Sequence, residues 1–147
     1  MFNPKEQARM EGGIDVPPGV YLVKLEEFTR KQSEKSGKDY LNIKLRIIDG
    51  DHKDSIIYDM CSLSENALWR LGNLCLSMGV QDQFDIEHDS EVKRMLVGKV
   101  GKCKTKYEDY NGQKNTRVAQ WMLLDESEEN RRGELTAAAG TGGEYPF

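Results

Sequence analysis

The sequence has few of the residues on which enzymes most often depend. Its 147 residues include two histidines, His52 and His88, and both lie in polar, acidic stretches that are typical of surface loops. It contains no Cys-x-x-Cys pair, no phosphate-binding P-loop and no Gly-x-Ser-x-Gly turn. We therefore expect a protein that is not an enzyme and that holds neither a cofactor nor a metal ion.

Cysteines and long apolar runs are also scarce. Cys61, Cys75 and Cys103 are odd in number and widely spaced, which favours reduced thiols over a disulfide framework. No apolar run approaches the roughly 18 residues of a membrane-spanning helix. The first residues lack the basic start and apolar stretch of a secretory signal. These features predict a cytoplasmic protein that does not bind membranes.

Alternating apolar residues predict five β-strands. The clearest alternation places Leu41, Ile43, Leu45 and Ile47 on one face of an extended segment. The last two strands form a hairpin around the turn pair at 111–112. The predicted strands span 16–28, 40–48, 55–63, 98–110 and 114–124.

One helix is predicted between the third and fourth strands. Ser62 and Glu65 have the spacing of a capping box, and Gly79 ends the apolar run at helical spacing that starts at Ala67. A shorter helix is expected at 91–96. Five strands with a helix in this place is the order of the OB-fold, a five-stranded Greek-key barrel. We therefore predict a mainly β OB-fold domain over residues 1–124, with residues 1–13 flexible.

The segment from Asp125 to the last residue differs in composition from the rest. It contains six acidic residues and two arginines, so the chain's net charge of −4 resides there. It contains no β-branched apolar residue, and such a segment buries too little surface to offset the entropy of ordering. We therefore expect residues 125–147 to form a disordered acidic tail.

Basic residues gather where an OB-fold binds its ligand, namely across strands two and three and in the loops between strands one and two and between strands four and five. Residues 24–46 hold seven bases and four acids, whereas residues 49–91 hold two bases and ten acids. Lys102, Lys104 and Lys106 alternate along the fourth predicted strand and therefore share one face. A solvated edge strand would explain these three lysines equally well.

Aromatic side chains lie among these bases, and a basic groove with stacking aromatics is typical of proteins that bind single-stranded nucleic acid. Trp121 is open to two interpretations, stacking or core packing, whereas Tyr21 and Tyr58 are expected in the core or at the barrel edge and Trp69 beneath the helix. The candidate nucleic-acid-binding residues are Arg30, Lys31, Lys35, Lys38, Tyr40, Lys44, Arg46, Lys102, Lys104, Lys106, Tyr107, Tyr110, Lys114, Arg117 and Trp121.

Two other functions are compatible with the sequence. The domain could bind another protein and no nucleic acid. Alternatively, a metal-dependent nuclease site could be built from Asp49, Asp51, Asp54 or Asp59, although turn residues explain these aspartates more simply.

The Pro-Pro-Gly-x-Tyr strand opening at 17–21, the basic hairpin, the "LVGK" at 96–99 and the acidic tail together resemble phage-encoded single-stranded-DNA-binding proteins of OB-fold type. This resemblance implies sequence-independent binding and protection of single-stranded DNA in phage replication or recombination. It also implies the host cytoplasm as the location. RNA binding and a homo-oligomer are compatible with it.

The ending "EYPF" is similar to the tip of bacterial single-stranded-DNA-binding proteins, in which acids precede a terminal Pro-Phe. In that family the tip docks replication and repair enzymes. The resemblance implies that Glu144, Tyr145, Pro146 and Phe147 bind such partners. The sequence departs from the family pattern at Tyr145, where an aliphatic residue is usual.

Overall fold

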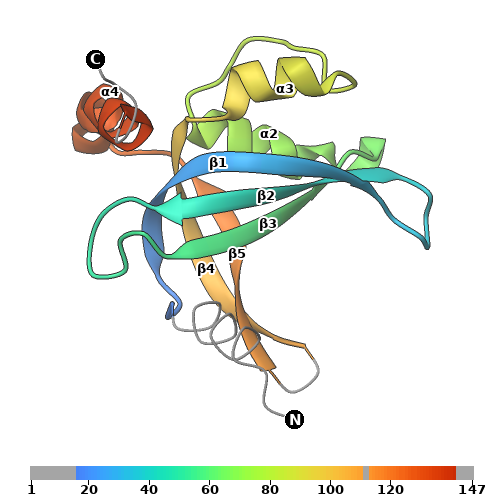
Figure 1. The fold of residues 1–147 in the computed structure, drawn as a ribbon, viewed down its shortest axis with the longest axis horizontal. Coiled ribbons are helices and arrows are strands. Elements are labelled where there is room, and N and C mark those ends of the chain that lie inside the picture. Colours follow the sequence, from blue (N-terminus) through green and yellow to red (C-terminus); the bar gives the residue numbers. More distant parts are fainter. Residues whose placement is uncertain (1–15, 111–112, 142–147) are drawn as a thin grey trace.

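The structure is a computed structural model that describes residues 16–110 and 113–141 (Figure 1). Its five strands form one sheet in the order β1-β2-β3-β5-β4, and β1 also pairs with β4, so the sheet closes into a ring. The strands are β1 (Val20–Gln32), β2 (Asp39–Ile47), β3 (Ile56–Ser62), β4 (Val100–Tyr110) and β5 (Gln113–Met122). The helical segments are η1 (Glu65–Ala67), α2 (Leu68–Ser77), α3 (Asp89–Leu96) and α4 (Glu126–Thr141).

The alternation in β2 is confirmed. Leu41, Ile43, Leu45 and Ile47 are fully buried inside the ring, and the intervening residues face outward. Burying a leucine or isoleucine side chain of this kind stabilises a fold by about 1.5–3 kcal/mol. The inward faces of β1 and β2 therefore form the centre of the core.

The inward face of β3 is less regular, because Asp59 lies between Ile57 and Cys61 and is as buried as they are. Its outward neighbours Tyr58 and Met60 are 41% and 51% exposed. Of the two places expected for Tyr58, the core or the barrel edge, the core is therefore wrong. In this part of β3 a polar residue faces the interior and its apolar neighbours face solvent. The alternation of polar and apolar residues therefore predicts the wrong face for them.

Helix α2 lies against β3, β4 and β5 and buries Leu71 and Leu74. The predicted capping box is wrong, because Ser62 ends β3 and Ser64 is the residue that precedes η1. Trp69 is not packed beneath the helix but is 64% exposed on its outer side. The predicted end of the helix is confirmed, since Gly79 follows it in the left-handed region at a φ of 78°.

Helix α3 covers β1, and Val92 and Leu96 are its buried residues. It begins two residues before the predicted segment, at Asp89. A loop and this helix therefore occupy the stretch between α2 and β4, so the fold has more helix than the sequence indicates.

The expectation of a disordered tail is corrected for residues 126–141, which form helix α4. Asp125 and Glu128 cap its first turn reciprocally, because each backbone N–H donates to the other's carboxylate at 2.8 Å. Arg132 anchors the helix by donating to the carbonyl oxygens of Val100 (2.6 Å) and Ser77 (3.2 Å). Polar contacts with the main chain thus order a segment that has little apolar surface to bury.

Candidate functional site

Four outward-facing residues form a row across the ring, which we call the cationic row: Lys44, Tyr58, Arg117 and Lys106. Each neighbouring pair consists of registered partners on adjacent strands: Lys44 with Tyr58, Tyr58 with Arg117, and Arg117 with Lys106. Since neighbouring strands are about 4.8 Å apart, the row spans roughly 14 Å. It places three positive charges and one exposed aromatic ring along a line that crosses β2, β3, β5 and β4.

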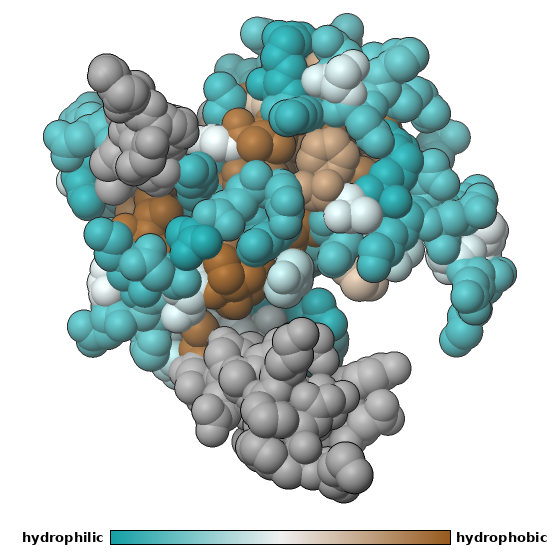
Figure 2. All heavy atoms as spheres, in the orientation of Figure 1, coloured by the Kyte–Doolittle hydropathy of each residue, from teal (hydrophilic) through white to brown (hydrophobic). Residues whose placement is uncertain are grey.

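Apolar surface adjoins this row on β3. Met60, next along the strand on the same side as Tyr58, is registered with Asn42 of β2. Figure 2 shows hydrophobic patches between hydrophilic side chains on the face turned to the viewer. An exposed ring and thioether beside cations provide stacking contacts together with charge.

A pocket of about 810 Å³, which we call the loop pocket, lies where the loop between β1 and β2 meets the outer face of β2 and β3. The loop closes through backbone hydrogen bonds between Ser33 and Lys38 (2.9 Å) and between Gly37 and Ser33 (2.8 Å). Gly37 has a φ of 70°, which favours glycine at this turn. The pocket is lined by Gln32, Ser33, Glu34, Lys35, Ser36, Lys38, Asp39, Tyr40, Met60 and Ser62.

A second pocket, of about 260 Å³, opens at the seam between β3 and β5, and we call it the seam pocket. These two parallel strands have one registered pair, Tyr58 with Arg117, and the sheet opens beyond that pair. Met60 borders both pockets, which makes them parts of one surface. The seam pocket is lined by Asp59, Met60, Arg70, Lys106, Glu108, Arg117, Val118 and Ala119.

The floor of the seam is a buried network around the carboxylate of Asp59. Arg70 of α2 donates to Oδ1 from Nη2 at 2.6 Å and from Nε at 3.2 Å, and Trp121 donates its Nε1–H to Oδ2 at 2.9 Å. Arg70 also donates to the carbonyl oxygen of Val118 at 2.7 Å, so it bridges β3 and β5. Burial lowers the pKa of Arg70, but the hydrogen bond to Asp59 and the negative charge of that carboxylate together outweigh this and raise the pKa above the ordinary value.

This network decides between the two interpretations of Trp121. The side chain is 8% exposed and its polar atom binds a buried carboxylate, so Trp121 is a core residue that cannot stack on a ligand. Cys61 and Cys103 lie in the same core. Burial raises the pKa of the Cys103 thiol to about 12, and the pKa of Cys61 also rises above its ordinary value. These thiols are therefore protonated and unsuited to nucleophilic chemistry.

Three of the predicted cations are held within the protein by short contacts, whereas Lys44 and Arg117 form longer ion pairs, at 3.7 to 3.9 Å. Arg30 contacts Asp89 of α3 at 2.7 Å and the carbonyl oxygen of Ile86 at 2.6 Å. Lys102 contacts Glu128 of α4 at 3.0 Å, and Arg46 forms an ion pair with Glu26. Arg30 and Lys102 thus hold helices onto the ring.

Of the predicted lysine stripe, Lys102, Lys104 and Lys106 do share the outer face of β4, but Lys104 and Lys106 are the exposed members. Lys31, Lys35 and Lys38 are exposed around the β1–β2 loop, and Tyr40 is half-buried at the loop pocket. Tyr107 is partly exposed beyond Lys106. The side chains of Tyr110 and Lys114, and the whole of Glu144, Tyr145, Pro146 and Phe147, lie outside the described residues.

Sequence reasoning missed three residues of this surface, namely Tyr58, Met60 and Arg70. Tyr58 and Met60 flank Asp59 in β3. They could be predicted as surface residues only if Asp59 was first assigned to the interior of the ring. Arg70 is the one base in a long acidic stretch between Lys53 and Lys93. That isolation indicates a specific partner, which is Asp59.

The four aspartates considered for a nuclease do not meet. Asp49, Asp51 and Asp54 follow β2 in the turn toward β3, whereas Asp59 is buried against Arg70. In residues 16–110 and 113–141, no three histidine, cysteine, aspartate or glutamate side chains are grouped to hold a metal ion. Among the same residues, no helix has the length and apolar character to cross a membrane.

The sequence matches no curated protein. A family model covers most of the chain, including the ring, α2, α3 and the first turn of α4. Residues 5–131 match the DUF669 family, described as a protein of unknown function, and the chain therefore belongs to that family.

Proposed function

We propose that the ring is an OB-fold and that the protein binds and protects single-stranded DNA without sequence preference, in replication or recombination. The strand order β1-β2-β3-β5-β4, with α2 between β3 and β4, agrees with that fold. An OB-fold binds oligonucleotides across strands two and three, beside the loop that joins strands one and two. The loop pocket and the cationic row lie in this region.

The cationic row is the observation that carries the proposal. Lys44, Arg117 and Lys106 are spaced along one line and contact phosphates, while Tyr58 lies between two of them and stacks on a base. The ion pairs of Lys44 and Arg117 are long, at 3.7 Å for Arg117 with Glu108, 3.7 Å for Lys44 with Glu27 and 3.9 Å for Lys44 with Glu26. Such exposed ion pairs contribute little, so phosphates displace the carboxylates.

The test is a fluorescence anisotropy titration of labelled oligo-dT at several salt concentrations. Each phosphate contact on a single strand contributes about −0.7 to the slope of log K against log salt, so three contacts give a slope near −2. No binding at low salt, or a slope near zero, contradicts the proposal. Oligo-U in place of oligo-dT tests the DNA preference, and incubation with magnesium tests for cleavage.

A protein-interaction role is the second candidate, and the outer side of α2 favours it. Trp69 and Leu76 are 64% and 50% exposed, and at 3.6 residues per turn they lie about 20° apart around the helix axis. Apolar residues placed together in this way are typical of binding surfaces. If Trp69→Ala leaves oligo-dT affinity unchanged, this surface is independent of DNA binding.

Recruitment of replication or repair enzymes through Glu144, Tyr145, Pro146 and Phe147 is a separate proposal. It is supported by the sequence resemblance alone.

A further inference from the structure

The seam pocket combines positive charge with an arginine that is already held in place. Its lining contributes three cations, Arg70, Lys106 and Arg117, and two acids, Asp59 and Glu108. The carboxylate of Asp59 is directed at Arg70, Trp121 and the N–H of Met60. The pocket therefore has an excess positive charge, and its deepest acid is already fully bonded.

Arg70 is preorganised with donor capacity remaining. Nε and Nη2 are fixed by Asp59 and by the carbonyl oxygen of Val118. Within residues 16–110 and 113–141, its Nη1 donates to no atom. A guanidinium that is fixed on one edge loses little conformational entropy when its other edge binds an anion, and arginine is well suited to phosphate.

The pocket also lies next to the cationic row, with which it shares Arg117 and Lys106. A nucleic-acid strand bound along the cationic row, from β2 toward β4, would pass the entrance of the seam pocket. Its volume of about 260 Å³ is ample for one phosphodiester group.

We propose that the seam pocket is a phosphate seat, in which Arg70, Lys106 and Arg117 hold one phosphodiester group of the bound strand. This inference rests on the proposed function and adds to it a residue from outside the sheet. Arg70 would couple the ligand to the interior of the ring, because the same side chain holds Asp59 and, through it, Trp121.

The experiment follows the side-chain resonances of Arg70 Nε–H and Trp121 Nε1–H by ¹H–¹⁵N NMR in the full chain. The probes are the dinucleotide TpT, which has one phosphodiester, and its uncharged methylphosphonate analogue. A dinucleotide is used because it has one linkage, so its neutral analogue has no second phosphate that could bind the pocket instead. We expect TpT to move both resonances saturably, and the neutral analogue to bind about tenfold more weakly by this signal, as for the loss of one charge-assisted hydrogen bond.

Two lysine variants provide the matched comparison. Lys106→Met removes a cation from the pocket and should weaken the TpT affinity reported by Arg70 severalfold. Lys93→Met removes an exposed lysine of α3 that does not line the seam pocket, and it should not change that affinity.

The outcomes separate the two proposals. If oligo-dT binds but the Arg70 resonance does not move, or moves equally with the neutral analogue, the phosphate seat is wrong and the proposed function stands. If oligo-dT does not bind at all, the proposed function itself fails.

Discussion

Trp121 donates its indole N–H to the buried carboxylate of Asp59 at 2.9 Å, which joins the fifth strand to the third through side chains. These strands have one registered backbone pair, Tyr58 with Arg117. The hydrogen bond therefore supports the ring where its backbone pairing is weakest.

The first prediction concerns this bond. Trp121→Phe retains an aromatic ring but removes the donor, so the free energy of unfolding should fall by about 1.5–3 kcal/mol, the range for a hydrogen bond to a charged group. Urea unfolding measures it. Trp69→Phe is the control, because Trp69 is exposed and its replacement should change stability by less than about 0.5 kcal/mol. Equal effects of both replacements would show that the bond is unimportant.

The second prediction separates stacking from packing. Tyr58→Ala should weaken oligo-dT binding by about 1–3 kcal/mol, because a base loses its stacking partner. Its melting temperature should change little, since Tyr58 faces outward. Anisotropy and thermal unfolding of the same sample test both statements. If the variant unfolds at a lower temperature but binds oligo-dT normally, Tyr58 has a structural role and does not stack on a base.

The third prediction divides the lysine stripe. Lys104→Ala and Lys106→Ala together should reduce oligo-dT affinity and make the salt slope less steep by about 0.7 for each phosphate that the protein no longer binds. Lys102→Ala should leave the slope unchanged and loosen α4 instead, because its ammonium group binds Glu128. Salt titrations compare the two variants. A slope that changes only in Lys102→Ala would reverse this assignment.

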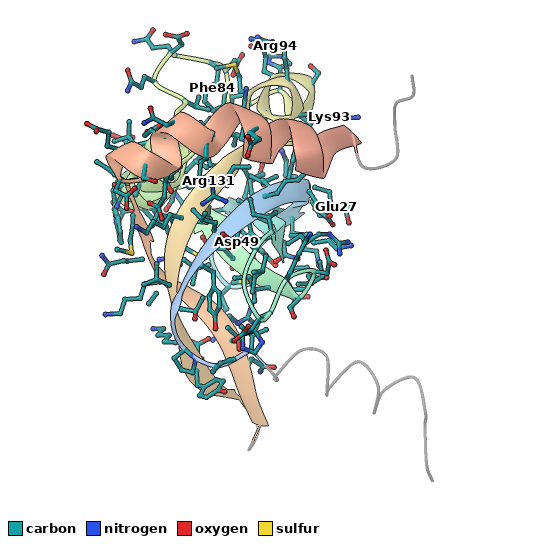
Figure 3. The ribbon with its side chains drawn as sticks, turned by 90° about the vertical axis from the view of Figure 1, so that its left-hand side faces the viewer. Glu27, Asp49, Phe84, Lys93, Arg94 and Arg131 are labelled. Atoms are coloured by element: carbon teal, nitrogen blue, oxygen red, sulfur yellow. The ribbon has the colours of Figure 1, made fainter. Side chains whose placement is uncertain are left out.

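The fourth prediction concerns the attachment of α4. Arg132→Ala removes the bonds to Val100 and Ser77, so amide protons of 126–134 should exchange faster with solvent. Arg131→Ala is the control, since the side chain of Arg131, labelled in Figure 3, is exposed. Hydrogen exchange by mass spectrometry compares the two. Equal exchange in both variants would mean that other contacts hold the helix.

The fifth prediction is a pH dependence. The hydrogen bond from Arg46 lowers the pKa of Glu26 below its ordinary 4.5. The stability from this pair is therefore complete above pH 4.5 and is lost as the pH falls through the lowered pKa. Glu26→Gln should lose stability at neutral pH and show a weaker dependence on pH below 4.5, measured by urea unfolding. Glu27→Gln, an exposed neighbour, serves as the control.

The strands were predictable because most of them follow the alternation of a half-buried sheet. Leu41 to Ile47 is the clearest case, and each of its apolar residues is buried as expected. The outer surface was harder to predict. Asp59 can be buried inside the ring because Arg70 and Trp121 donate hydrogen bonds to its carboxylate. These partners lie 11 and 62 residues away, so no local sequence pattern predicts its burial.

Helix α4 was not predictable for a related reason. Composition measures how much apolar surface a segment can bury, and residues 126–141 have little. What orders the helix is a capping box with Asp125 and an arginine whose partners are main-chain carbonyls on β4 and α2. Figure 1 shows that α4 lies at the opposite end of the ring from the β1–β2 loop, so its acids do not cover the loop pocket.

The way Arg132 is bound has a consequence for how this chain tolerates change over evolution. Its partners at 77 and 100 are carbonyl oxygens, which every amino acid carries, so neither contact by itself requires a particular side chain at those positions. Gly79 is different, because a Cβ there would come within 3.2 Å of the guanidinium carbon and the backbone is left-handed. In homologous sequences that keep this helix, an arginine at 132 and a glycine at 79 should therefore occur together.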